Sequence, residues 1–151
     1  MKSIVIYYSY GGNTRHVAEK VAAAIGTVKP YTGSYDHVVE QGQKEVNSGF
    51  QPKIRQINTD LSKYDTVILG TPVWWYTFAP AMNSFLHSED LSEKSIYPFA
   101  TNGGWIGHTF KDFENACKGA TVHVGLNVRF NEDEQITSDD EIQKWVKQIA
   151  K

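Results

Sequence analysis

The chain has 151 residues, of which 40% are hydrophobic, and a formal net charge of −2 with an isoelectric point near 6.2. A chain of this length can bury on the order of 70% of its unfolded surface in one core, so we expect one domain over residues 1–151. The charge argues against a nucleic-acid partner, no apolar run reaches the roughly 18 residues of a membrane span, and the single cysteine, Cys117, points to a reducing, cytoplasmic compartment.

The N-terminal part of the chain predicts a strand over residues 3–8 and then a helix over residues 13–25. The apolar positions of this helix share one face, and Gly26 is placed to end it. Residues 27–60 carry weaker patterns. They suggest an edge strand at 27–31, a helix from about 36 to 46, and a polar loop.

The middle of the chain predicts a central strand and a helix. Residues 66–70 form a continuous apolar run, which is typical of a strand buried on both faces of a parallel sheet. Pro80 then opens a helix, because proline is tolerated in a first turn. A further strand is expected over residues 96–100.

The C-terminal part predicts helix, strand and helix in turn. One helix carries an apolar face from Phe110 to Cys117, and the last strand is expected over residues 120–126. Ser138 and Glu141 have the spacing of a capping box and open the final helix. This alternation of strands and helices predicts an α/β fold with βαβ units and a parallel sheet.

A loop of hydroxyl, glycine and amide residues between the first strand and the first helix is the first candidate site. Backbone N–H groups and the positive end of the helix dipole should meet there and hold an anion. The loop lacks the lysine of the nucleotide triphosphatase cradle, and its neutral donors suit a phosphate monoester. A plain strand-to-helix turn is the alternative interpretation. This first loop comprises Ser9, Tyr10, Gly11, Gly12, Asn13 and Thr14.

Two further loops, residues 71–76 and 101–107, also follow strand-like runs. Because parallel strands place their carboxyl ends at one edge of the sheet, the three loops should converge on one site. The candidate residues are Thr71, Pro72, Val73, Trp74 and Trp75 in the second loop, and Thr101, Asn102, Gly103, Gly104 and Trp105 in the third.

The chemistry of these two loops suggests the rest of the ligand. Flat aromatic faces can sandwich a planar ring system, and glycines let backbone N–H groups approach ring oxygens closely. Together with the first loop, this predicts a phosphorylated planar heterocycle. Ordinary core packing is the alternative for Trp74 or Trp75, because adjacent residues usually point in opposite directions.

At these residues the chain resembles the flavodoxin family, in its short-chain branch. Residues 9–14 match the family's first loop, a hydroxyl residue followed by x-[T/G]-G-N-T, and the runs L-G-T-P-V-W-W at 69–75 and P-F-A-T-N-G-G at 98–104 look like its second and third flavin loops. The resemblance implies FMN as cofactor, with its phosphate on residues 9–14. It also implies a flavodoxin-like three-layer sandwich around a doubly wound, five-stranded parallel sheet in the order 2-1-3-4-5.

The resemblance implies an FMN-binding protein that acts in electron transfer with a redox protein partner. The alternative is an FMN-dependent NAD(P)H:quinone-type oxidoreductase with a small-molecule acceptor, and a flavin-binding sensory module without turnover is a third possibility. Flavodoxins that carry electrons typically have a strongly acidic docking face, whereas this chain is nearly neutral. We expect no catalytic side chain and no metal ligand.

Two details bear on these alternatives. His108 follows the third loop and is expected to be a solvated surface histidine, because nothing near it in the sequence orients it. The alternative is that it contacts a substrate above the flavin. The second loop contains no glycine, and a bulky residue at positive φ costs roughly 1–2 kcal/mol. A peptide turn in that loop should therefore be costly, which favours reduction in a single two-electron step and hence the oxidoreductase alternative.

Overall fold

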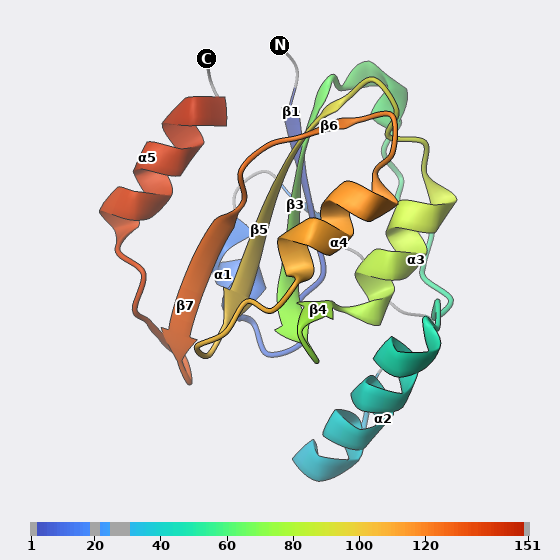
Figure 1. Ribbon diagram of the computed structural model, residues 1–151, viewed down its shortest axis with the longest axis vertical. Helices are drawn as coiled ribbons and strands as arrows, with labels where there is room; N and C mark the ends of the chain where they lie inside the picture. The colour runs from blue at the N-terminus through green and yellow to red at the C-terminus, as the bar shows by residue number, and fades with distance from the viewer. Residues whose placement is uncertain (1–2, 19–21, 25–30, 150–151) are drawn as a thin grey trace.

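The computed structural model describes residues 3–18, 22–24 and 31–149, which form a twisted sheet with helices on both faces (Figure 1). Eight strands form the sheet in this part of the chain, and the five longest run parallel in the order β2-β1-β3-β5-β7, which corresponds to the expected order 2-1-3-4-5. The expected count of five left out three short strands. The five longest strands are β1 (Ser3–Tyr7), β2 (Ala22–Ala24), β3 (Thr66–Trp74), β5 (Ser95–Asn102) and β7 (Leu126–Asn131).

In the described residues, three short strands and five α-helices complete the fold. Two-residue strands β4 (Thr77–Phe78) and β8 (Glu134–Gln135) pair antiparallel with β3 and β7, and β6 (Thr121–Val122) pairs parallel with β5. The helices are α1 (Asn13–Ala18), α2 (Tyr35–Ser48), α3 (Pro80–Ser88), α4 (Thr109–Ala116) and α5 (Asp139–Ile149), and a 3-10 turn spans Leu61–Lys63.

Helix ends follow the signals in the sequence. Ser34 caps α2 by accepting the N–H of His37, and Gly49 ends it in the left-handed conformation that glycine adopts readily. Proline occupies the start of α3, and the N–H of Glu141 donates to Ser138 Oγ over 3.2 Å at the start of α5. The predicted helices near 36–46, after Pro80 and after Ser138 are therefore confirmed.

Each face of the sheet carries its own apolar core, because successive strand residues point to opposite faces. On one face, residues such as Val67 and Leu69 pack with α3 and α4 around Phe85 and Phe113. On the other face, α1 and α5 cover Phe99. The strands between the two layers are nearly continuous apolar runs, as expected for a parallel sheet covered on both sides.

The predicted first helix is too long. It was expected over 13–25, whereas residues Ala22–Ala24 form β2 and pair with Val5, Ile6 and Tyr7. Alanine favours helices, but pairing with the edge of β1 overrides that weak preference. Residues 19–21 and the predicted helix end at Gly26 lie outside the described part of the chain. Of the edge strand expected at 27–31, only Tyr31 is described, and it belongs to no strand.

The predicted last strand, 120–126, is also wrong in its bounds. β6 pairs with the start of β5 and β7 with its end, and residues 123–125 between them belong to neither strand. The phenyl ring of Phe110 packs against Gly125 so closely that a Cβ there would lie 2.5 Å from it. The interruption therefore makes room for a side chain from α4.

The second loop is mostly strand. β3 continues past Gly70 to Trp74 and returns as β4 after a tight turn, so residues 71–74 are part of a hairpin. Polar and proline residues after the apolar run concealed this extension, because they resemble a loop.

Candidate functional site

The three candidate loops lie at one edge of the sheet, where β1, β3 and β5 end (Figure 1). Two contacts hold them together. The N–H of Tyr8 donates to the carbonyl of Gly70 over 3.0 Å, and Thr14 Oγ1 lies 2.7 Å from Thr101 Oγ1. The convergence expected from the sequence is therefore present in the structure.

Ser9 organises the first loop. Its Oγ accepts the N–H of Gly12 over 3.1 Å and that of Arg15 over 3.3 Å, so the hydroxyl proton of Ser9 is left to donate elsewhere. A Cβ built on Gly11 or Gly12 would meet nothing within 4 Å, and both glycines are exposed. The loop therefore presents open backbone to the solvent at the edge of the sheet.

Asn13 and Thr14 anchor the first loop to two different parts of the structure. Asn13 Nδ2 donates to the carbonyl of Glu132 over 2.9 Å, which ties the loop to the turn between β7 and β8. Thr14 is buried, with 1% of its surface exposed. Its hydroxyl is engaged with Thr101, so Thr14 joins two loops at their base. Tyr10, by contrast, is half exposed at the tip.

Thr71 and Pro72 lie inside the hairpin. Thr71 is fully buried, and its Oγ1 accepts the N–H of Ala79 over 3.0 Å and donates to the carbonyl of Pro72 over 2.8 Å. Its hydroxyl therefore supports the start of α3. Val73 pairs with Phe78 across the hairpin.

Trp74 and Trp75 are both oriented toward α2. Trp74 packs edge-on against Tyr8, Tyr10 and Tyr31, with ring centroids 6.1, 5.9 and 5.0 Å away, and its ring lies against Gly42 of α2. The indole N–H of Trp75 donates to the carbonyl of Val39 on α2 over 3.1 Å. Both tryptophans are half-buried, so each combines a packing role with a surface that remains accessible.

Tyr76 is the aromatic residue that meets the third loop. Its ring centroid lies 4.6 Å from that of Trp105, and the two side chains are 46% and 65% exposed. Sequence reasoning counted Tyr76 among the aromatic residues of the second loop but proposed Trp74 or Trp75 as the partner of Trp105.

The hairpin turn has left-handed backbone at two bulky residues. Trp75 has φ 47° and Tyr76 has φ 71°, a region that non-glycine residues seldom adopt. Such conformations persist when surrounding contacts fix them. Positive φ, which sequence reasoning regarded as costly for this glycine-free loop, is thus already part of the folded turn.

The third loop is open at its glycines and tied at both ends. Asn102 Oδ1 accepts the N–H of Gly104 over 3.0 Å, and Asn102 Nδ2 donates to Asn127 of β7. A Cβ on Gly103 or Gly104 would meet nothing within 4 Å. Like the first loop, the third presents unobstructed backbone next to exposed aromatic side chains.

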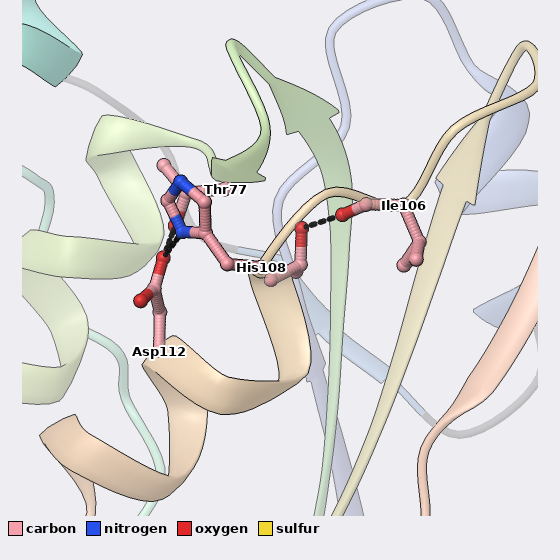
Figure 2. A network of polar contacts seen from close by, with 5 residues as sticks. Thr77, Ile106, His108 and Asp112 are labelled. Atoms are coloured by element: carbon pink, nitrogen blue, oxygen red, sulfur yellow. Dashed lines mark hydrogen bonds and ion pairs between the residues drawn. The ribbon is translucent and has the colours of Figure 1, made fainter.

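The third loop is clamped to the hairpin where α4 begins. Gly107 has φ 60°, a Cβ there would lie 2.4 Å from the carbonyl oxygen of Tyr76, and the N–H of His108 donates to that oxygen over 2.8 Å. Asp112 binds both His108 Nδ1 and the hydroxyl of Thr77 (Figure 2). The expectation that nothing orients His108 is therefore wrong. Its partner lies one helical turn later, a spacing that the sequence does contain.

Burial changes the acidity of two tyrosines beside Trp74. It raises the pKa of Tyr8 to about 12, with smaller contributions from Tyr10 and Glu45. Burial, followed by the nearby Glu45 carboxylate, also raises the pKa of Tyr31 above its ordinary value. These phenols are neutral at physiological pH, and the acidic group beside them is Glu45.

Within residues 3–18, 22–24 and 31–149, no group of three or more histidine, cysteine or acidic side chains could hold a metal ion. Cys117 is a free, buried thiol whose pKa burial raises to about 11, which fits a packing role. In that same part of the chain, no helix is long and apolar enough to cross a membrane.

Comparison with known proteins identifies the family. The family model for flavodoxin matches residues 2–149. The chain belongs to the flavodoxin family. A search by sequence among curated proteins gives no match.

Solved structures agree with this family assignment. A candidate flavoprotein from Bacteroides eggerthii is 25% identical, with a TM-score of 0.83 over 99% of this chain and 98% of that one. A flavoprotein from Lactobacillus acidophilus, solved in complex with FMN, is 21% identical, with a TM-score of 0.76 over 96% and 98%. An NADPH-quinone reductase from P. pentosaceus is 14% identical, with a TM-score of 0.53 over 98% and 95%. These last two likenesses show the shared fold.

Proposed function

We propose that this flavodoxin-family protein binds FMN at the edge formed by its three loops and acts in electron transfer. The observation that carries the proposal is the convergence of an open polar loop, residues 9–14, with an exposed aromatic pair, Tyr76 and Trp105. Family membership and a structural neighbour solved with FMN support the choice of cofactor. When bound, FMN supplies electron-transfer chemistry, and the protein supplies binding, orientation and electrostatics.

The first loop fits the phosphate of FMN. Ser9 has a hydroxyl proton to donate, and the backbone at Gly11 and Gly12 is open to a ligand. Neutral donors of this kind bind a phosphate without a buried counter-charge, and hydrogen bonds to an ionised acceptor are stronger than neutral ones. The base of the loop is held by the contact between Thr14 and Thr101, so its donors are positioned before the ligand arrives.

The second and third loops fit the ring system. Trp105 and Tyr76 offer flat, exposed faces, and Gly103 and Gly104 leave space in which backbone donors could approach ring oxygens. Trp74 and Trp75 would close the α2 side of the site. We therefore assign ring binding to residues 74–76 together with 102–105.

The absorption spectrum and ligand affinities of the purified protein test the cofactor. We expect flavin bands in the visible spectrum, release of FMN on denaturation, and weaker binding of riboflavin than of FMN by the apoprotein. Ser9→Ala should weaken FMN binding by about 1–3 kcal/mol and leave riboflavin binding nearly unchanged, because only FMN carries the phosphate. Equal affinities for the two ligands would remove the phosphate site from the proposal.

A second candidate function is reduction of a small-molecule acceptor, as in an NAD(P)H:quinone-type oxidoreductase. The contact between His108 and Asp112 beside the third loop favours it, because oriented imidazoles serve acid–base chemistry. A carrier would exchange electrons with a redox protein partner instead. Steady oxidation of NAD(P)H by the purified FMN-loaded protein, with a quinone and no added protein, would support the oxidoreductase. Both functions are compatible with a cytoplasmic location.

A further inference from the structure

The third loop begins with an asparagine that is followed by a glycine. Asn102 and Gly103 form the one Asn-Gly pair in the sequence. The side-chain amide of an asparagine reacts with the backbone nitrogen of the next residue when that nitrogen can reach it, and a Cβ on the next residue hinders the approach. Glycine has no Cβ and leaves the backbone free to turn. The pair therefore has the residue types from which asparagine loses its amide most readily.

The structure leaves the backbone nitrogen of Gly103 accessible. Gly103 is exposed, and a Cβ built on it would meet nothing within 4 Å. The backbone hydrogen bonds of the described residues include none from the N–H of Gly103. This nitrogen is thus neither shielded by neighbours nor held by an acceptor.

Two hydrogen bonds hold the side chain of Asn102 next to that nitrogen. Asn102 Oδ1 accepts the N–H of Gly104 over 3.0 Å, and Asn102 Nδ2 donates to Asn127 Oδ1 on β7. The first bond closes a turn around Gly103. It also stabilises the negative charge that builds up on Oδ1 when a nucleophile attacks Cγ. The side chain is therefore placed and polarised for attack by the nitrogen of Gly103.

We propose that Asn102 is a site of spontaneous deamidation, and that this modification inactivates the ring site of protein that lacks its cofactor. The reaction itself needs only water. Its effect on ligand binding rests on the proposed FMN function, because Asn102 belongs to the loop to which we assign the ring.

Atoms balance in this reaction, and no oxidant or reductant takes part. The nitrogen of Gly103 forms a bond to Asn102 Cγ and gives up its proton. The bond from Cγ to Nδ2 breaks, and ammonia leaves with that proton. Water then opens the resulting cyclic imide at either carbonyl, which gives aspartate or isoaspartate at position 102. The net change is the uptake of water and the release of ammonia.

Both products disturb the third loop. Aspartate adds a negative charge there and has no N–H to donate to Asn127. Isoaspartate carries the main chain through Cβ, which lengthens the backbone just before Gly103 and Gly104. These glycines are the ones to which we assign the ring oxygens, whereas the first loop keeps its structure. The loss should therefore fall on ring binding and spare the phosphate site.

Cofactor binding should oppose the reaction. In the proposed complex the ring lies against the backbone of Gly103 and Gly104, so a bound ligand restrains the segment that must turn for the attack. A ligand that binds the native loop lowers the population of other conformations. The chemical state of Asn102 would then record how long the protein has been without FMN.

Mass spectrometry of aged protein tests the modification. Apoprotein and FMN-loaded protein are incubated side by side, and their peptides are separated so that asparagine, aspartate and isoaspartate are distinguished at each position. In the apoprotein we expect Asn102 to convert before any other asparagine, and we expect Gly103→Ala to slow its conversion by about tenfold or more. Saturating FMN should slow it by about the same factor. Asn47, an exposed residue of α2 that is followed by serine, is the internal control and should persist.

Asn102→Asp reproduces one product in fresh protein and tests the consequence. We expect this variant to bind FMN and riboflavin about tenfold more weakly than the wild type, because the change lies at the ring and both ligands carry the ring. The matched control is Asn115→Asp, which adds the same charge at an exposed position of α4. The control should leave both affinities unchanged, and thermal unfolding should show that both variants are folded.

The possible outcomes are distinct. An intact Asn102 in aged apoprotein, under conditions that convert a synthetic peptide of residues 99–106, would overturn the modification site. Equal conversion with and without bound FMN would overturn the protection, and wild-type affinities in Asn102→Asp would overturn the effect on the ring site. If fresh wild-type protein binds no FMN, the proposed function and the inactivation both fail, while conversion of Asn102 in the apoprotein still supports the modification.

Discussion

Thr14 and Thr101 form a buried hydroxyl pair that joins the first loop to the third across the end of the sheet. Their Oγ1 atoms lie 2.7 Å apart, and the two residues are 1% and 5% exposed. The two loops are far apart in sequence, so this bond fixes the spacing of the proposed phosphate and ring subsites at their common base. A site of this kind is rigid where its loops leave the strands and open at their tips.

Thr14→Val should lower the free energy of unfolding by about 1–3 kcal/mol, because the Thr101 hydroxyl would stay buried without its partner. Urea denaturation of the apoprotein measures this. The double variant Thr14→Val, Thr101→Val should recover part of the loss, since removing both polar groups is cheaper than stranding one. Strictly additive losses in the double variant would argue against a direct bond.

Gly107→Ala should destabilise the apoprotein by more than about 1 kcal/mol. The new Cβ would lie 2.4 Å from the backbone carbonyl of Tyr76, at a φ of 60° that alanine seldom adopts. The comparison is Gly103→Ala, whose Cβ would meet nothing within 4 Å. Thermal unfolding should detect the loss in the first variant only. If the ring site is where we propose, Gly103→Ala should instead weaken FMN binding.

The alternation of strands and helices was predictable from the sequence, because each buried strand is a distinct apolar run such as residues 66–70. β2 was not, since three alanines carry a helical preference and become a strand only by pairing with β1. The break between β6 and β7 was equally hidden. It depends on the ring of Phe110, which reaches Gly125 from another element.

The convergence of the three candidate loops was predictable, but their internal contacts were not. Glycines and hydroxyl residues after three strands indicated where the loops converge. Nothing local indicated that Trp74 and Trp75 both turn toward α2 and leave Tyr76 to meet Trp105. The left-handed turn at Trp75 and Tyr76 depends on long-range contacts, including the carbonyl of Tyr76 bound by His108.

The buried phenol of Tyr8 should make the protein less stable at alkaline pH. Its pKa is raised to about 12 in the folded state, against about 10 in the unfolded chain. Between these values the folded protein holds the proton that the unfolded chain has lost, so the free energy of unfolding falls as the pH rises. Below about pH 10 the effect is absent.

Tyr8→Phe should make this alkaline decline shallower, because phenylalanine does not titrate. Urea denaturation at a series of values between about pH 9 and 11 measures the slope. The raised pKa of Tyr31 predicts that part of the decline remains in this variant. An unchanged slope would mean that Tyr8 ionises in the folded protein as easily as in the unfolded chain.

Trp105→Ala should weaken FMN binding by about 1–3 kcal/mol, the scale for losing one stacked aromatic. Because Trp105 is 65% exposed, the same change should alter the stability of the apoprotein by no more than about 0.5 kcal/mol. Titration of apoprotein with FMN should quench tryptophan emission, and this quenching should be smaller in Trp105→Ala.

The control is Trp145→Phe. Trp145 is a buried residue of α5, and its indole N–H donates to the carbonyl of Val124 over 3.0 Å. That variant should lose stability through its core and keep its FMN affinity. The opposite pattern, with FMN affinity retained in Trp105→Ala, would place Trp105 outside the ring site and leave its exposed face to a partner or an acceptor.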